Sequence, residues 1–156
     1  MSSFLETVMN RAVAHAVQHV AGGGLPFVGV VVRDGQVLSG FGVNQVLETS
    51  DPMAHAEIVA LREAVASHGR GGLIGATLLA TGEPCGMCYR HAITHGISDV
   101  RVAVDRDVVA AHDFDYRASY SMFGIDDELR ASLMQPLRVP GDLLPFTMFL
   151  NHHPQS

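Results

Sequence analysis

The stretch Glu83-Pro84-Cys85-Gly86-Met87-Cys88 places two thiols in the first turn of a helix that we expect from about Cys85 to His95. The positive end of a helix dipole favours thiolates, and the thiolate is the form of cysteine that binds a metal ion. Two thiolates are half of a tetrahedral zinc site, but a redox-active pair has the same spacing. Taken alone, Cys85 and Cys88 leave metal binding and redox chemistry equally open.

A second motif, His55-Ala56-Glu57, decides between these two interpretations. It adds an imidazole and a carboxylate near the start of another expected helix, for which Asp51-Pro52 is the N-terminal signal. Residues two apart within a helix point about 200° apart. His55 and Glu57 can therefore serve one centre only where that helix begins. The motif favours a zinc site built from His55, Cys85 and Cys88.

Three protein ligands leave a tetrahedral zinc ion one ligand short, which is typical of a catalytic site and not of a structural one. Zinc lowers the pKa of a bound water towards neutrality and so generates hydroxide. Glu57 is not a ligand in this scheme, so it can take that proton and later deliver it to a leaving amine. The alternative is that His91 or His95 supplies a fourth ligand, which would make the site structural and leave Glu57 without a role.

Hydrophobic periodicity and turn signals predict an alternation of helices and strands around these motifs. The expected elements are a helix from the capping box at Ser3 to about Gly22, strands over 27–33 and 37–43 joined by Asp34-Gly35, a helix from about Asp51 to Gly69, a strand over 77–81, the helix over 85–95, and a strand over 100–104. Residues 105–125 have no clear pattern, 126–134 indicate a helix, and 143–150 are apolar enough to pack on the rest of the chain.

The composition bounds the class of protein. The chain has 156 residues and is 47% hydrophobic, which suits a single domain over residues 1–156. It has no apolar run of membrane-spanning length and no secretory start, so we expect a cytoplasmic protein with no membrane partner. The formal net charge is −6 and no lysine is present, which makes a nucleic-acid partner unlikely. The two cysteines are only three residues apart, which excludes a disulfide scaffold.

The combination of H-x-E with P-C-x-x-C is the signature of zinc-dependent nucleobase deaminases. Together with Pro26-Phe27, Asn44 and Asp51-Pro52, the two motifs resemble the cytidine-deaminase-like superfamily over roughly residues 4–105, and within it bacterial guanine deaminases and tRNA adenosine deaminases. The resemblance implies an α/β fold, a three-layer α/β/α sandwich around a central mixed five-stranded sheet. It also implies a homodimer whose neighbouring subunits help to complete the pocket.

The same resemblance implies a set of substrate contacts. Asn44 would hydrogen-bond the base and Phe27 would flank its plane. The residues expected to contact the substrate are Phe27, Asn44, Ala56 and Asp115. Asn44 is equally typical of a turn and Phe27 equally typical of a core, so both alternatives stay open. Guanine deaminases would have two acidic residues after the phenylalanine of this segment, whereas this chain reads Phe114-Asp115-Tyr116.

The sequence therefore predicts a zinc-dependent hydrolase that removes the amino group from a free nucleobase or analogue, with a guanine-like base as the leading expectation. Cytosine, an aminotriazine or a nucleoside fits the same catalytic set, because the chemistry requires only an amino-bearing aromatic carbon. A tRNA adenosine deaminase is disfavoured by the acidic composition. A non-catalytic, zinc-stabilised binding module is disfavoured by the presence of Glu57.

Overall fold

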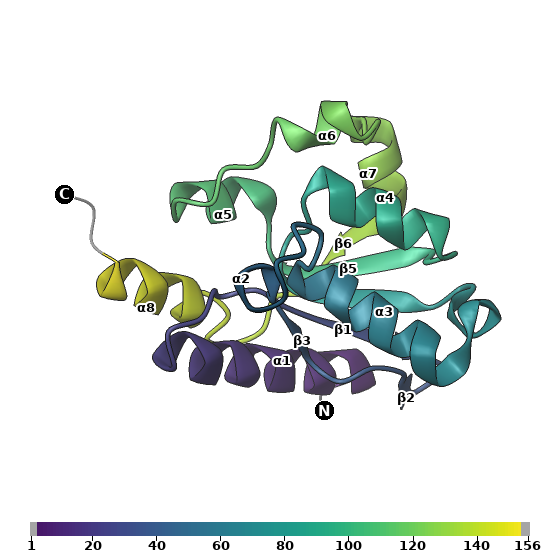
Figure 1. Cartoon of the computed structure of the whole chain (residues 1–156), viewed down its shortest axis with the longest axis horizontal. Helices are drawn as coiled ribbons and strands as arrows, with labels where there is room; N and C mark the ends of the chain where they lie inside the picture. The colour runs from purple at the N-terminus through teal and green to yellow at the C-terminus, as the bar shows by residue number, and fades with distance from the viewer. Residues whose placement is uncertain (1–2, 154–156) are drawn as a thin grey trace.

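The computed structural model describes residues 3–153 and is built around a mixed β-sheet (Figure 1). Its strands are β1 (Val28–Arg33), β2 (Gln36–Val37), β3 (Gly42–Val43), β4 (Thr77–Gly82), β5 (Asp99–Val104) and β6 (Met134–Pro136). The order across the sheet is β2-β1-β4-β5-β6, and β3 also pairs with β1. β1 runs antiparallel to β2, β3 and β4, whereas β4, β5 and β6 run parallel to one another. The expected mixed sheet of an α/β fold is confirmed.

Helices cover both faces of this sheet. They are α1 (Phe4–Ala21), α2 (Val46–Thr49), α3 (Ala56–His68), α4 (Gly86–Thr94), α5 (Arg106–Ala111), α6 (Ser119–Met122), α7 (Asp127–Leu133) and α8 (Leu144–His152), with a 3-10 helix over Arg70–Leu73. None of the helices in residues 3–153 is long and apolar enough to cross a membrane.

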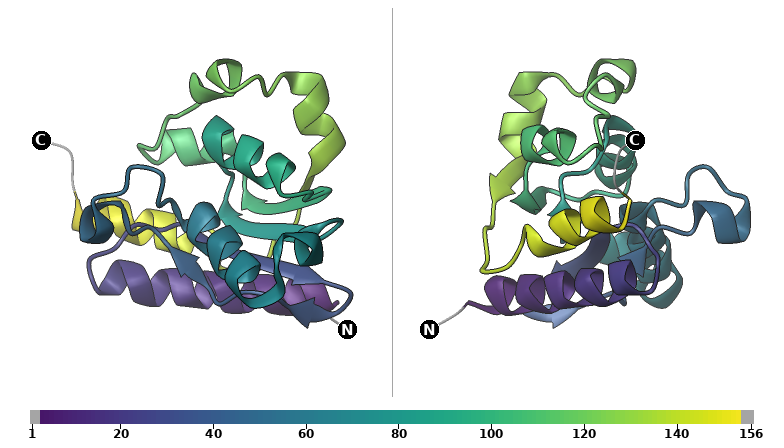
Figure 2. Two further views of the ribbon diagram at one scale, coloured as in Figure 1. Left: turned by 45° about the vertical axis from the view of Figure 1, so that its right-hand side comes forward. Right: turned by 90° about the vertical axis from the view of Figure 1, so that its left-hand side faces the viewer.

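The alternation of side chains along β1 separates two hydrophobic cores. Val28, Val30 and Val32 are buried in one core with the apolar face of α1 and Phe146 of α8, whereas Val31 is buried in the other with α3 and α4. Successive strand residues point to opposite faces, so this valine-rich strand is apolar on both. Figures 1 and 2 show α1 and α8 side by side on one face and α3 and α4 on the other. The three-layer arrangement is confirmed.

The sheet has six strands where we expected five. The strand expected over 37–43 is split into β2 and β3. The four residues 38–41 lie opposite only two residues of β1, 30–31, so they bulge out and interrupt the pairing with β1. At this bulge the Ser39 hydroxyl accepts from the Val31 backbone N–H at 3.0 Å, in place of a backbone carbonyl. The helix expected over 126–134 is present as α7. The last strand of the sheet, β6, follows α7 directly and was not expected.

Two expected helix starts have different outcomes. Ser3 caps α1 by accepting from the Glu6 N–H at 3.1 Å, as the capping box predicts. The helix expected from Asp51 begins later, at Ala56, with His55 as its N-cap. Asp51 instead closes a turn, since its side chain accepts from Met53 N–H at 2.9 Å and its carbonyl accepts from Ala54 N–H at 3.0 Å. The short helix α2, which the sequence did not predict, precedes this turn.

Candidate active site

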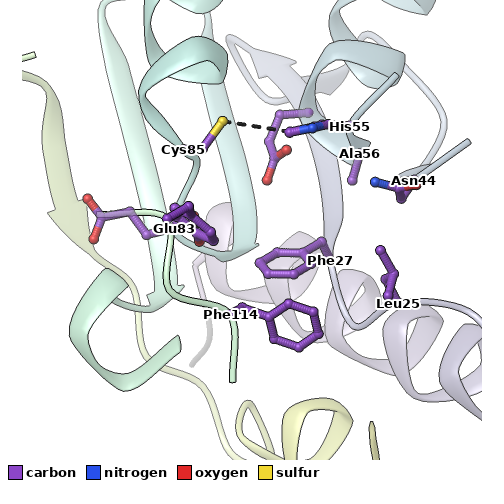
Figure 3. A pocket seen from close by; sticks show the side chains of 10 residues that line it. Leu25, Phe27, Asn44, His55, Ala56, Glu83, Cys85 and Phe114 are labelled. Carbon is purple, nitrogen blue, oxygen red and sulfur yellow. Dashed lines mark hydrogen bonds between the residues drawn. The ribbon is translucent and has the colours of Figure 1, made fainter. Parts of the chain in front are cut away.

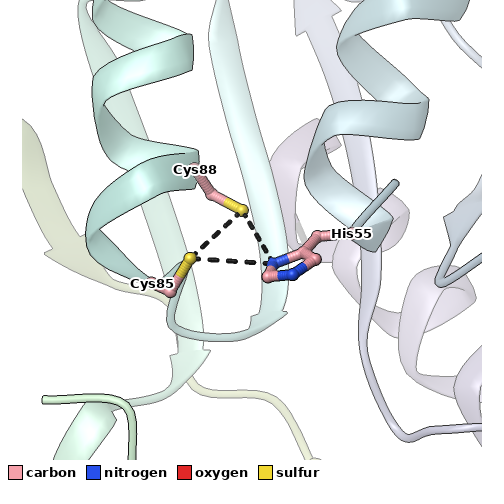
Figure 4. Close-up of side chains that lie close together, drawn as sticks. All are labelled: His55, Cys85 and Cys88. Carbon is pink, nitrogen blue, oxygen red and sulfur yellow. Dashed lines mark hydrogen bonds between the residues drawn. The ribbon is translucent and has the colours of Figure 1, made fainter. Parts of the chain in front are cut away.

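Two helix starts meet at the edge of the sheet where β4 and β5 end and β1 begins. His55 is the N-cap of α3 and Cys85 is the N-cap of α4, and both have extended backbone conformations. Neither side chain caps its own helix, so both project from the helix ends towards one another (Figure 4). The positive ends of the two helix dipoles converge here, which favours thiolates over thiols.

The three predicted ligand atoms form a compact triangle. His55 Nδ1 lies 3.4 Å from Cys88 Sγ and 3.7 Å from Cys85 Sγ, and the two sulfurs are 3.6 Å apart (Figure 4). Zinc binds sulfur at about 2.3 Å and imidazole nitrogen at about 2.1 Å, so tetrahedral ligands are separated by about 3.6 to 3.8 Å. The triangle fits a tetrahedral zinc ion with three protein ligands.

The two thiols of this triangle differ in pKa. The hydrogen bond from Cys88, together with the neighbouring His55, lowers the pKa of the Cys85 thiol to about 4. The same hydrogen bond, followed by burial, raises the pKa of Cys88 above its usual range, because the two sulfurs share one proton. Zinc binding would displace that proton, since the metal takes both sulfurs as thiolates.

Glu57 lies beside this triangle in the first turn of α3. It is 3% exposed, and its Oε2 is 3.5 Å from Cys88 Sγ. Burial raises the pKa of the Glu57 carboxyl to about 7. Gly29 of β1 allows this approach, because a Cβ at that position would lie 2.9 Å from Glu57 Cα. Among the described residues, the metal-binding group comprises His55, Cys85 and Cys88, so Glu57 is next to the metal site without being part of it.

The alternative with a fourth histidine ligand has no support in this geometry. His91 and His95 lie one turn apart on the flank of α4, and their Nε2 atoms are 3.1 Å from each other. Within residues 3–153, neither histidine joins the group formed by His55, Cys85 and Cys88. Three protein ligands leave a tetrahedral position available to water or substrate, as in catalytic zinc sites.

A cavity of about 210 Å³ opens beside the metal-binding group (Figure 3). Its walls are mainly apolar, and it is lined by Leu25, Phe27, Asn44, His55, Ala56, Glu57, Glu83, Cys85, Phe114 and Tyr116. Three of the predicted substrate contacts, Phe27, Asn44 and Ala56, are therefore brought to the pocket.

The ring of Phe27 is fixed by packing and by its backbone. It meets Phe114 edge-to-face at 5.1 Å and Phe146 of α8 edge-to-face at 5.4 Å between ring centroids. The Thr81 hydroxyl accepts from Val28 N–H at 2.9 Å and donates to the Pro26 carbonyl at 3.1 Å, which holds the backbone on both sides of the ring. Phe27 thus belongs to a packed aromatic cluster and also forms a wall of the pocket.

Asn44 takes part in a turn and also lines the pocket. Its Oδ1 accepts from Val46 N–H at 3.1 Å, which is a turn interaction. Its side chain lines the pocket, and Figure 3 shows the amide nitrogen on the side of Ala56. The turn therefore fixes Asn44 with a donor directed at the cavity.

The structure does not bring Asp115 to the pocket. Its side chain is exposed and forms an ion pair with Arg117, with Asp115 Oδ2 at 2.9 Å from Arg117 Nη2. This ion pair lowers the pKa of Asp115 to about 2. Phe114 and Tyr116, on either side of Asp115 in the sequence, both line the pocket, whereas the Asp115 side chain faces solvent. The sequence interpretation missed Tyr116, although its spacing of two from Phe114 is the signal that would have identified it.

Comparison with known proteins identifies deaminases as the relatives of this chain. The family model described as the cytidine and deoxycytidylate deaminase zinc-binding region matches residues 2–104, which contain both motifs. A guanine deaminase of Bacillus subtilis is 33% identical over 147 residues, covering 94% of this chain and 94% of the relative. A tRNA-specific adenosine deaminase of Haemophilus influenzae is 36% identical over 129 residues, covering 83% of this chain and 70% of the relative.

Solved structures support the same grouping. The structure of a guanine deaminase from Nitrosomonas europaea superposes on this chain with a TM-score of 0.72 and 27% identity. The superposition covers 96% of this chain and 85% of that one. It therefore extends beyond the residues that the family model matches, into the C-terminal third of the chain.

Proposed function

We propose that this chain, which belongs to the cytidine and deoxycytidylate deaminase family, removes the amino group from a free guanine-like base. Membership makes it a zinc-dependent hydrolase of the C–N bonds of cyclic amidines. The observation that carries the proposal is the Glu57 carboxylate beside a three-ligand metal site at an aromatic-lined cavity. Guanine is favoured because guanine deaminases are among the relatives that match along nearly the whole chain.

The proposed role of Glu57 follows from its position. When bound, zinc supplies a Lewis acid that activates water at neutral pH. Glu57 Oε2 lies 3.5 Å from the sulfur of Cys88, one of the three residues that would hold the metal, and Glu57 lines the same cavity. The burial of this carboxylate excludes bulk water as a competing proton acceptor. In this proposal Glu57 holds the proton removed from water and delivers it to the leaving amine.

The proposed binding of the base uses the shape of the pocket. Pockets for drug-sized ligands measure roughly 300 to 1,000 Å³, so a cavity of about 210 Å³ suits a free base better than a nucleoside. Phe27 offers a ring to the flat substrate, and the Asn44 amide offers a donor to an oxygen or ring nitrogen. Ala56 is in the first turn of α3, where backbone N–H groups have no partner within the helix. We do not include Asp115 in the proposed site.

The charges of the chain argue against an RNA substrate, although tRNA adenosine deaminases are among its relatives. Phosphate binding needs arginine or lysine side chains that are available to the backbone of the nucleic acid. Most arginines of this chain instead pair with carboxylates of the chain itself. The paired arginines are Arg33, Arg62, Arg101, Arg106, Arg117, Arg130 and Arg138.

The test is a measurement of ammonia release by zinc-loaded protein. The compounds are guanine, adenine, cytosine, their nucleosides, an aminotriazine and a tRNA transcript, with the Glu57→Gln variant as the matched control. We expect ammonia from guanine, little from guanosine, and none from the control variant. Release from cytosine or the triazine alone would replace guanine while retaining the deaminase. Preferential release from tRNA would overturn the proposal of a free base.

A further inference from the structure

Glu83 is a fully buried carboxylate that the proposed chemistry does not use. It directly precedes Pro84-Cys85, and it is 0% exposed. Its backbone borders the cavity, but Figure 3 shows its carboxylate pointing away from the other labelled side chains of the pocket. A buried charge without partners is strongly unfavourable, so the protein must satisfy this group elsewhere.

Four donors surround the Glu83 carboxylate. Arg130 of α7 binds it in a bidentate manner, with Nε at 2.5 Å from Oε2 and Nη2 at 2.8 Å from Oε1. The Tyr89 hydroxyl donates to Oε2 at 2.8 Å, and the Arg106 backbone N–H donates to Oε1 at 2.8 Å. A carboxylate has about four lone-pair sites, so its hydrogen-bonding capacity is filled.

These donors hold the start of the thiol loop, a name that we give to residues 83–88, which connect β4 to α4 and include the first turn of α4. Glu83 precedes both thiols in the sequence and Tyr89 immediately follows Cys88. The hydrogen bond from the Tyr89 hydroxyl to the Glu83 carboxylate therefore joins the two ends of the segment that carries the thiols. The link closes the loop on the side away from the pocket. Arg130 and Arg106 then attach this closed loop to α7 and to the start of α5.

The backbone of the thiol loop is attached to the same region of the chain. The Tyr120 hydroxyl donates to the Pro84 carbonyl at 2.5 Å, and the Ser119 hydroxyl accepts from Gly86 N–H at 2.8 Å. The Tyr116 hydroxyl donates to the Glu83 carbonyl. Residues 105–130 therefore hold both the side chain and the main chain of the loop that carries Cys85 and Cys88.

We propose that Glu83 and Arg130 are positioning residues of the metal centre, which hold the thiol loop in the geometry that binds zinc. Neither side chain is part of the group of metal ligands. Arg130 acts through Glu83, because its two hydrogen bonds fix the carboxylate that closes the loop. The inference rests on the metal centre and not on the choice of base, so measurements of metal binding test it independently of the substrate.

The test compares zinc affinity in two arginine variants. Arg130→Met removes the charge and both hydrogen bonds while keeping an unbranched side chain. Arg138→Met is the matched control, since Arg138 also binds a buried carboxylate in a bidentate manner, with Nε 2.7 Å from Asp142 Oδ2 and Nη2 2.9 Å from Asp142 Oδ1. Zinc affinity is measured by competition with a chromogenic chelator, and folding by circular dichroism.

We expect Arg130→Met to weaken zinc binding by about 10- to 100-fold, the range seen when partners of metal ligands are removed. The absorption spectrum of the Co²⁺-substituted protein should also change, because it reports the geometry of the ligands. Arg130→Lys should recover part of the affinity, since it restores the charge but not the bidentate pair. Arg138→Met should leave zinc affinity and the Co²⁺ spectrum unchanged.

Two results would overturn the inference. The first is a folded Arg130→Met protein with unchanged zinc affinity and Co²⁺ spectrum. The second is an equal loss of zinc affinity in Arg138→Met, which would indicate general destabilisation. If Arg130→Met does not fold, Tyr89→Phe removes one of the four hydrogen bonds and keeps the ring. A several-fold loss of zinc affinity in Tyr89→Phe then supports the inference, and unchanged affinity contradicts it.

Discussion

Replacing Asn44 with aspartate separates its turn interaction from its proposed contact with the base. Aspartate keeps the oxygen that accepts from Val46 N–H, but it has no amide donor to direct into the cavity. Loss of that donor leaves a buried acceptor of the base unpaired, which costs about 1 to 3 kcal/mol. We therefore expect kcat/KM to fall by roughly 5- to 150-fold. Zinc content should not change, because Asn44 is not a ligand.

Asn44→Ala is the comparison that completes this experiment. Alanine loses both the donor and the turn bond, and a typical hydrogen bond contributes about 0.5 to 1.5 kcal/mol to stability. We expect Tm to fall by a few degrees, about 2 to 4 °C per kcal/mol for a chain of this length, and kcat/KM to fall as in Asn44→Asp. The assay is steady-state ammonia release with guanine. Wild-type kcat/KM in Asn44→Asp, together with a lower Tm in Asn44→Ala, would refute the contact and leave only the turn.

Three other predictions test the remaining parts of the site. Glu57→Gln should retain zinc by metal analysis while kcat falls by about 10²- to 10⁴-fold, and near-wild-type turnover would contradict its role. Gly82→Ala should lower stability by about 1 to 3 kcal/mol in denaturant titration and raise KM, because the new Cβ would lie 2.7 Å from Phe146 Cζ and 2.8 Å from Phe27 Cε1. The chain should sediment as a dimer, since side chains such as Leu47 and Met122 are 90% and 77% exposed, and a monomer at micromolar concentration would refute this.

The sequence predicted the metal-binding group well, because each ligand has a local signal. The helix expected over 85–95 is present as α4. His55 and Cys85 are both N-cap residues, so each lies at the start of its helix, where its side chain can reach a shared metal. The start of α3 was placed too early, since Asp51-Pro52 is typical of a helix start and of a turn. The turn forms because the Asp51 side chain accepts from Met53 N–H. No local pattern distinguishes these two outcomes.

Residues 105–125 could not be assigned because their structure depends on contacts far along the chain. α5 and α6 are short and have little hydrophobic periodicity of their own. Their order comes from partners such as Pro84, which lies 36 residues from Tyr120 in the sequence. The propensity of a short segment contains no information about such a partner.

The position of Asp115 shows how backbone geometry limits the transfer of a residue's role from a family pattern. An acidic residue next to Phe114 was expected to face the base, but Asp115 is exposed and pairs with Arg117, and its neighbour Tyr116 lines the pocket instead. The Tyr116 hydroxyl donates to the Glu83 carbonyl, at the start of the thiol loop. One side chain therefore forms a wall of the pocket and also supports the metal ligands. A substitution of Tyr116 that alters substrate preference would consequently also shift the zinc-binding thiolates.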